Sequence, residues 1–150
     1  MRRAIVQTVL LSLAAVLFVQ PAICEHPDLS GSWQLDVPAS TFGAMTIPNS
    51  GELNITPGAR KTLHIQRVLK EPQGERTTDT EWKTDDRFHP VVGDEPGTLL
   101  AKWDGSVLVG RRHTNAGMEE IHLAAGGDGV TMIESIQSAQ GTRTMVWRRR

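Results

Sequence analysis

Hydrophobic and polar residues follow each other in short segments, and no segment after residue 24 keeps apolar residues at helical spacing over three turns. The segments are rich in Thr, Val, Ile and Trp and lie between clusters of Gly, Pro and Asp, which is typical of strands joined by turns. We expect strands over 31–36, 51–56, 61–70, 76–84, 98–103, 106–112, 118–124, 130–137 and 142–148. The pattern therefore predicts an all-β domain of about eight or nine strands.

Most connections between these segments are short and contain Gly, Pro, Asn or Asp. Short loops force consecutive strands to pair antiparallel, so we expect an up-and-down meander that forms a closed or half-open barrel. Two connections are longer, 37–50 with Phe42 and 85–97 with Phe88. We expect an aromatic of this kind to plug an end of the barrel, and the long loops to form a binding mouth.

Two turns predict which residues face each other. A two-residue loop at Asp104-Gly105 would set Trp103 opposite Ser106, and it would place Leu99, Ala101, Trp103 and Leu108 on one face. A three-residue loop over 139–141 would set Glu134 opposite Val146, with Arg148 diagonal to Glu134 as its structural partner.

The first residues have the pattern of an export signal. Arg2 and Arg3 precede an apolar run from Val9 to Val19 of about 11 residues, which is shorter than the ~20 that span a bilayer. Small residues end the run, so we expect a signal peptide over 1–24, cleaved before Glu25 or after Ala22, and one secreted or periplasmic domain over 25–150. The alternatives are an uncleaved anchor and a lipid attached to Cys24, although the residues before Cys24 depart from a lipid-attachment motif.

The charge balance and the cysteine count limit the possible partners and the sources of stability. The expected leader removes only Arg2 and Arg3, so 14 basic residues face 17 acidic ones in the rest of the chain. A nucleic-acid-binding domain has a strong basic excess, so we expect no such partner. The single cysteine, Cys24, lies in the leader. The domain therefore has no disulfide of its own, and we expect its stability to come from the core.

The sequence contains no complete catalytic or metal-binding motif. The five histidines lack the close spacing of a zinc site, and no nucleophile elbow is present. Glu119 and Glu120 are adjacent in a strand and so point to opposite faces, which favours solvated surface over a shared site. We therefore expect no catalytic residue, no metal and no cofactor, although a site assembled from distant strands, for example at His64, His113 and His122, stays an alternative.

Three residues are candidates for ligand contact. Arg67 lies in line with Leu63, Ile65 and Leu69, so it would bring a charge to an apolar stripe. Facing inward it could meet the carboxylate or polar head of a ligand; at a strand end its stem would cover apolar surface and its head would be in water. Trp82 and Trp103 could line an apolar cavity or belong to the core. These alternatives stay open.

The stretch Gly31-Ser32-Trp33 at the start of the first expected strand resembles the G-x-W motif that opens lipocalins. The resemblance implies that Trp33 closes the barrel floor and that Arg148 or Arg149, near the chain end, packs across it. The layout over residues 28–149 is also similar to small exported lipocalin-like proteins of bacteria. The absent disulfide, the absence of a C-terminal helix pattern and the ninth strand depart from lipocalins and leave closure of the barrel open.

Together these features predict an exported, non-catalytic protein that binds a small, mostly apolar ligand through Trp82, Trp103 and Arg67. A cell-envelope structural or protein-interaction module, with a solidly packed interior and no ligand cavity, is the alternative. Cavity volume distinguishes the two.

Overall fold

The computed structural model describes residues 26–92 and 96–150. The expected signal peptide and Cys24 lie outside the described residues. The chain folds into ten strands: β1 Gly31–Thr41, β2 Ser50–Pro57, β3 Thr62–Glu71, β4 Gly74–Lys83, β5 Phe88–Val91, β6 Gly97–Asp104, β7 Val107–Thr114, β8 Gly117–Ala125, β9 Thr131–Ser138 and β10 Gly141–Arg149. None of the described residues forms a helix long and apolar enough to cross a membrane.

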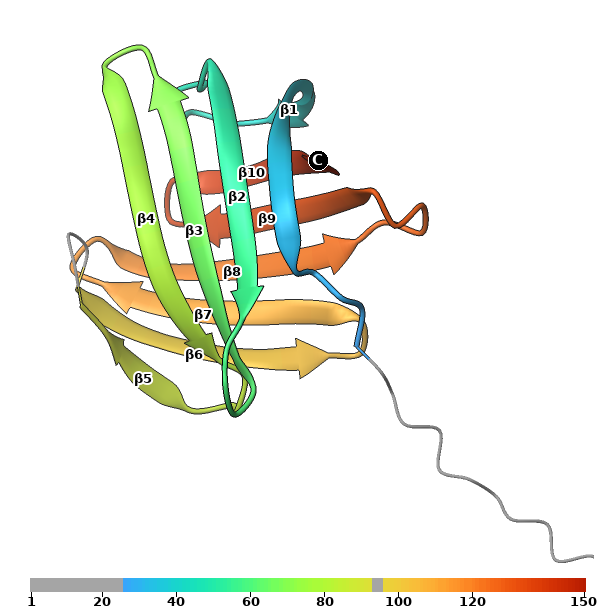
Figure 1. Ribbon diagram of the computed structural model, residues 1–150. Coiled ribbons are helices and arrows are strands. Elements are labelled where there is room, and N and C mark those ends of the chain that lie inside the picture. Colours follow the sequence, from blue (N-terminus) through green and yellow to red (C-terminus); the bar gives the residue numbers. More distant parts are fainter. Residues whose placement is uncertain (1–25, 93–95) are drawn as a thin grey trace, which may run out of the picture.

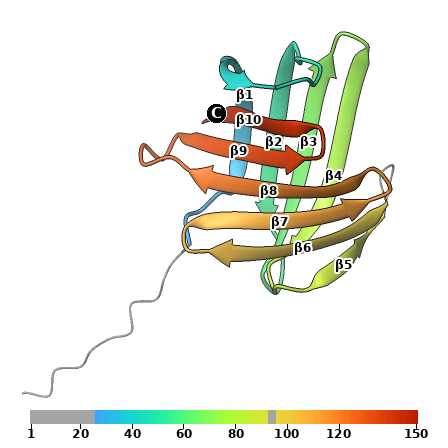
Figure 2. The ribbon, with the colours of Figure 1, turned by 180° about the vertical axis from the view of Figure 1, so that it is seen from behind.

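The ten strands form one antiparallel sheet that curls into a nearly closed barrel. Their order is β4-β3-β2-β1-β10-β9-β8-β7-β6-β5, so each strand pairs with its neighbour in sequence and β1 pairs with β10. Strands β1 to β4 cross in front of β6 to β10 in Figure 1, and the reverse view shows the second group in front (Figure 2). The all-β meander predicted from the sequence is confirmed.

Within the described residues, the barrel is open between its two edge strands, β4 and β5. A hydrogen bond from the Asp86 amide to the Ala101 carbonyl (3.1 Å) ties the β4–β5 connection to β6. The Thr84 amide also bonds the Lys61 carbonyl at 3.0 Å. The first of these bonds fastens the β4–β5 connection at one end of the opening, and the second extends the β3–β4 pairing, so the barrel closes nearly but not fully.

Two strands differ from the sequence prediction. Strand β5 lies within the expected loop 85–97, because its four residues pair with β6 although Pro90 interrupts the strand pattern. Strand β1 continues past Pro38 through an irregularity between Asp36 and Thr41. The Ser40 hydroxyl accepts the Val146 amide there at 2.9 Å, and Pro is tolerated in strands at such bulges.

The predicted registers at both turns are wrong. In the first hairpin Asp104 pairs with Val107 and Trp103 with Leu108, so Gly105 and Ser106 form the turn. Only Gly105 has a positive φ (59°), as a turn with glycine at the first central position requires. The pairing therefore shifts by two residues, which leaves each side chain on its predicted face.

The second hairpin has a two-residue turn instead of the predicted three. Ser138 pairs with Gly141, and Glu134 pairs with Met145 instead of Val146. Gly141 takes φ 113° at the fourth turn position. A shift of one residue exchanges the faces of β10, so Met145 and Trp147 are buried and Arg148 is exposed.

We call the end of the barrel with turn 105–106 the floor end, and the end with turns 115–116 and 139–140 the mouth end. Large buried side chains fill the interior toward the floor end. The largest fully buried ones are Trp33, Trp147, Leu53, Ile55, Leu108, Leu123, Met132, Met145 and Glu134. Phe42 also joins this core, as expected, whereas Phe88 is exposed and contacts the His113 ring edge-on outside the barrel.

Trp33 closes the floor as the lipocalin resemblance implies. Its ring is buried, and its indole Nε1 donates to the Leu29 carbonyl at 3.0 Å. The guanidinium of Arg149 lies 4.4 Å from the ring centroid and donates to the carbonyls of Ser30 and Asp28. Arg149, one of the two arginines expected there, is the one that packs across Trp33.

Candidate functional site

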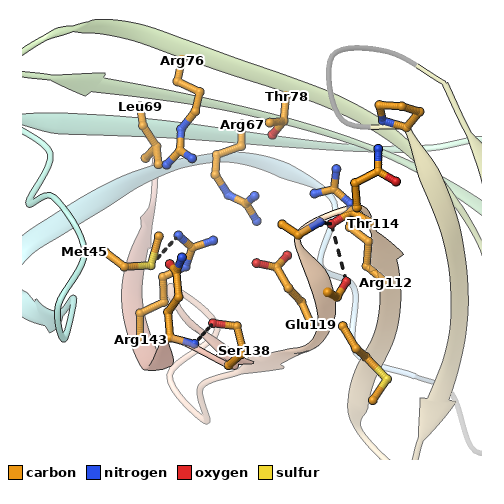
Figure 3. Close-up of a pocket in the computed structure, with 17 residues that line it drawn as sticks. Met45, Arg67, Leu69, Arg76, Thr78, Arg112, Thr114, Glu119, Ser138 and Arg143 are labelled. Carbon is orange, nitrogen blue, oxygen red and sulfur yellow. Dashed lines mark hydrogen bonds between the residues drawn. The ribbon is translucent and has the colours of Figure 1, made fainter.

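A cavity of about 360 Å³ occupies the mouth end of the barrel, above the packed core. Its wall contains four arginines and one glutamate, namely Arg67, Arg76, Arg112, Arg143 and Glu119. Met45 and Leu69 add apolar surface, and the turns β7–β8 and β9–β10 form part of the rim. Figure 3 shows the charged side chains converging on this space from opposite walls. The cavity is small, and its wall combines charged groups with apolar surface.

Strand alternation explains why these charges point inward. Arg67 shares a face with Ile65 and Leu69, both buried, and Arg112 shares one with Leu108. Successive side chains on a strand point to opposite faces, so a charge in phase with core residues faces the interior. Four of the five charged residues lie near the mouth end of their strands, and Arg67 lies midway along β3. The same strands therefore supply core at one end and charge at the other.

Arg67 forms an ion pair with Glu134 inside the barrel. Glu134 is fully buried and also accepts a hydrogen bond from the Trp147 indole at 3.0 Å. The sequence-based pairing of Glu134 with Arg148 is wrong, because the register shift turns Arg148 outward. Arg148 bonds Asp36 (3.1 Å) and the Thr131 hydroxyl (2.8 Å) instead.

Arg143 has a poorer set of partners than Arg67. Its Nη1 donates to the Met45 sulfur at 3.1 Å, and a thioether is a weak acceptor. Its Nε, like that of Arg67, is buried without a hydrogen-bond partner among the described residues. Burial lowers the pKa of the Arg143 guanidinium, and the Arg67 cation lowers it further, against smaller opposite effects of Glu134 and Glu119. An arginine stays charged at physiological pH, so the fold holds this cation at a cost in free energy.

Glu119 and Glu120 have different environments. Glu120 points outward, where Arg111 (3.0 Å) and His122 (2.7 Å) bind its carboxylate. The His122 hydrogen bond is the main cause of the lowered pKa of Glu120. Glu119 lines the cavity, and among the described residues its carboxylate has no hydrogen bond and no ion pair. The prediction that both are solvated surface therefore fits Glu120 only.

Of the three predicted ligand contacts, only Arg67 lines the cavity. Trp82 is buried in the core and lies over Gly110 of β7. Trp103 is half-buried at the floor end, where its ring stacks on His26 with centroids 4.6 Å apart. Both tryptophans come near the ends of strands that run from mouth to floor. Their position along the strand, and not their polarity, keeps them out of the cavity wall.

The structure does not bring together the three histidines considered for a site assembled from distant strands. His64, His113 and His122 all lie on outward-facing positions of their strands. His89 bonds Asp85 at 2.9 Å on the barrel surface. Within residues 26–92 and 96–150, no group of three or more His, Cys, Asp or Glu is placed to hold a metal ion.

Comparisons with known proteins add the fold relationship. No family model and no curated protein matches the sequence. Similar solved structures include the fluorescent protein UnaG (TM-score 0.63, 10% identity, 81% of this chain and 97% of that one) and the REP1-NXSQ fatty acid transporter (0.62, 13%, 82% and 96%). A third is fatty-acid-binding protein 1 of Echinococcus granulosus (0.61, 10%, 81% and 96%). The chain shares the β-barrel fold of these proteins. Identities this low establish the fold alone.

Proposed function

We propose that this chain is an exported, non-catalytic binding protein for a small amphipathic ligand whose acidic head group lies against the interior arginines. The observation that carries the proposal is Arg143, a charged group in the cavity wall whose one hydrogen bond within the described residues goes to the Met45 sulfur. Arg143 is half-buried with its Nε fully buried, and a cation withdrawn from water is costly unless an anion pairs with it. An acidic ligand would supply that anion.

The fold and the cavity size support the proposal. Two of the similar barrels are described as a fatty acid transporter and a fatty-acid-binding protein. A cavity of about 360 Å³ lies at the lower end of ligand-site volumes. At about 30 Å³ for each non-hydrogen atom, taken from the volume of water, it holds roughly a dozen atoms. We therefore propose a short ligand, or the head end of a longer one.

The alternative of an envelope interaction module with a solid interior is less well supported. The floor end fits that description, because its side chains are fully buried. The mouth end is hollow and carries the charged residues. Export is proposed from the leader pattern of residues 1–24, and the mass of the mature protein would show cleavage before Glu25, cleavage after Ala22, or a lipid on Cys24.

The test compares octanoate with its methyl ester, which has the same chain but neither a charge nor a hydrogen-bond donor, by calorimetry on the mature protein. We expect octanoate to bind at least about tenfold more tightly, the effect of one charge-assisted hydrogen bond. Arg143→Gln should remove this preference. Arg111→Gln, on the outer surface, removes the same charge and should leave it unchanged. Equal binding of both probes, or full retention of the preference by Arg143→Gln, would refute an arginine-bound head group.

A further inference from the structure

The cavity holds a second charged group for which the described part of the chain offers no partner, and this one is negative. Glu119 projects from β8 into the space that the guanidinium groups of Arg67 and Arg143 also approach (Figure 3). Arg67 is paired with Glu134, whereas the structure gives Glu119 no hydrogen bond within residues 26–92 and 96–150. A ligand with only an acidic head would satisfy Arg143 and leave Glu119 beside a second carboxylate.

From this arrangement we propose that the preferred head group carries an amino or hydroxyl hydrogen-bond donor close to its acid, with the acid on Arg143 and the donor on Glu119. The inference rests on the proposed function and narrows its ligand class. A carboxylate accepts hydrogen bonds and cannot donate them when ionised. An ammonium or hydroxyl group therefore pairs with Glu119, whereas the carboxylate of a simple fatty acid is repelled by it.

The neighbouring Glu120 shows that Glu119 is not simply one of a surface pair. Strand alternation directs Glu120 outward to Arg111 and His122, while Glu119 takes the same face as Ile121, which is buried. Both glutamates belong to one strand and differ by one position. Glu120 therefore supplies a matched control with the same chemistry on the opposite face.

Glu119 has one competing role, that of an internal counter-ion that lowers the net charge of the arginine-rich wall. Its negative charge favours the cationic form of Arg143. A counter-ion would weaken the binding of every acid by the same mechanism, whatever else the head group carries. A donor partner for the ligand would instead discriminate between acids with and without a donor. The two roles therefore predict different effects of the same substitution.

The experiment measures the affinities of octanoate and 2-hydroxyoctanoate for the mature wild-type protein, Glu119→Gln and Glu120→Gln by calorimetry at pH 7. Both probes have the same chain length and the same net charge of one carboxylate, and only the second has a hydrogen-bond donor beside the acid. The measured quantity is the ratio of the two affinities in each protein. The two probes differ in hydration, and this difference cancels when the ratio is compared between variants. Circular dichroism and urea unfolding confirm that each variant is folded.

We expect the ratio of 2-hydroxyoctanoate to octanoate affinity to fall about tenfold in Glu119→Gln and to stay at the wild-type value in Glu120→Gln. A ratio unchanged by Glu119→Gln, including tighter binding of both probes, would overturn the inference. The proposed function would stand as long as Arg143→Gln removes the preference for octanoate over its methyl ester. Failure of the wild-type protein to bind either probe would remove both proposals.

Discussion

The buried pair of Arg67 and Glu134 allows a quantitative test of how charge is held inside this barrel. Arg67→Met removes the cation and leaves Glu134 fully buried, with the Trp147 indole as its remaining donor. Removing one partner of a buried pair costs about 3–5 kcal/mol, and the retained indole bond favours the lower end, about 3 kcal/mol. In Arg67→Met/Glu134→Gln the charge is absent and the amide oxygen still accepts from Trp147. We expect that double variant to lose only about 1 kcal/mol, for the unpaired amide N–H groups.

Urea unfolding followed by tryptophan fluorescence measures these free energies. For a domain of this size about 3 kcal/mol corresponds to a fall of roughly 12 °C in Tm, so thermal scans give a second reading. Arg111→Met, which removes an exposed partner of Glu120, should change stability by less than about 0.5 kcal/mol. A loss below about 1 kcal/mol for Arg67→Met, or a double variant no more stable than the single one, would refute the assignment of a buried, mutually dependent pair.

Three further predictions concern the floor and the core. A methyl group at Gly110 would lie 2.5 Å from Cη2 of Trp82, so Gly110→Ala should cost about 1–3 kcal/mol in urea unfolding, while Gly127→Ala, in open space, should be nearly neutral. Arg149→Met loses the contact with the floor tryptophan and two carbonyl hydrogen bonds, and a loss of about 1–2 kcal/mol is expected; no loss would argue against the floor role. Hydrogen bonds from Ser30 lower the pKa of Asp28, so its carboxylate stabilises the fold at neutral pH and this contribution disappears as pH falls through the lowered pKa. The stability gap between wild type and Asp28→Asn should therefore close below about pH 4, and a gap that widens in acid would contradict the assignment.

The positions of the strands were predicted from the sequence better than their pairing registers. Alternation of apolar residues depends on local chemistry, so nine of the ten strands could be placed from it. The missed strand, β5, has only four residues and contains Pro90, so it has too little pattern to stand out. Pairing depends instead on turn type. In the turns at Gly105 and Gly141 a single glycine takes the positive φ, and its place in the turn was not evident from composition.

The register error in the second hairpin explains why Arg143 was missed as a site residue. With Glu134 opposite Val146, Arg143 would face solvent, whereas the observed pairing of Glu134 with Met145 turns Arg143 into the cavity. Arg67 was found because it shares a stripe with buried leucine and isoleucine. Glu119 has the same signal, since it is in phase with Ile121 and Leu123. A charged residue that alternates in step with buried apolar residues of its strand was therefore a usable signal of a site residue. The tryptophans Trp82 and Trp103 were not.

The two ends of the barrel have different roles in our proposal: the packed floor end stabilises the fold, and the mouth end binds the ligand. At the floor end each fully buried large apolar side chain contributes about 1.5–3 kcal/mol, and Trp33, Trp147, Leu53 and Met132 are among many such residues. The free energy gained from this apolar burial offsets the cost of holding Arg143 in the cavity wall at the mouth end. An acid that pairs with Arg143 would remove part of that cost. The cost that is removed then adds to the binding free energy of the ligand. Occupancy should therefore stabilise the protein by mass action, by about 2.7 kcal/mol at a ligand concentration one hundred times Kd.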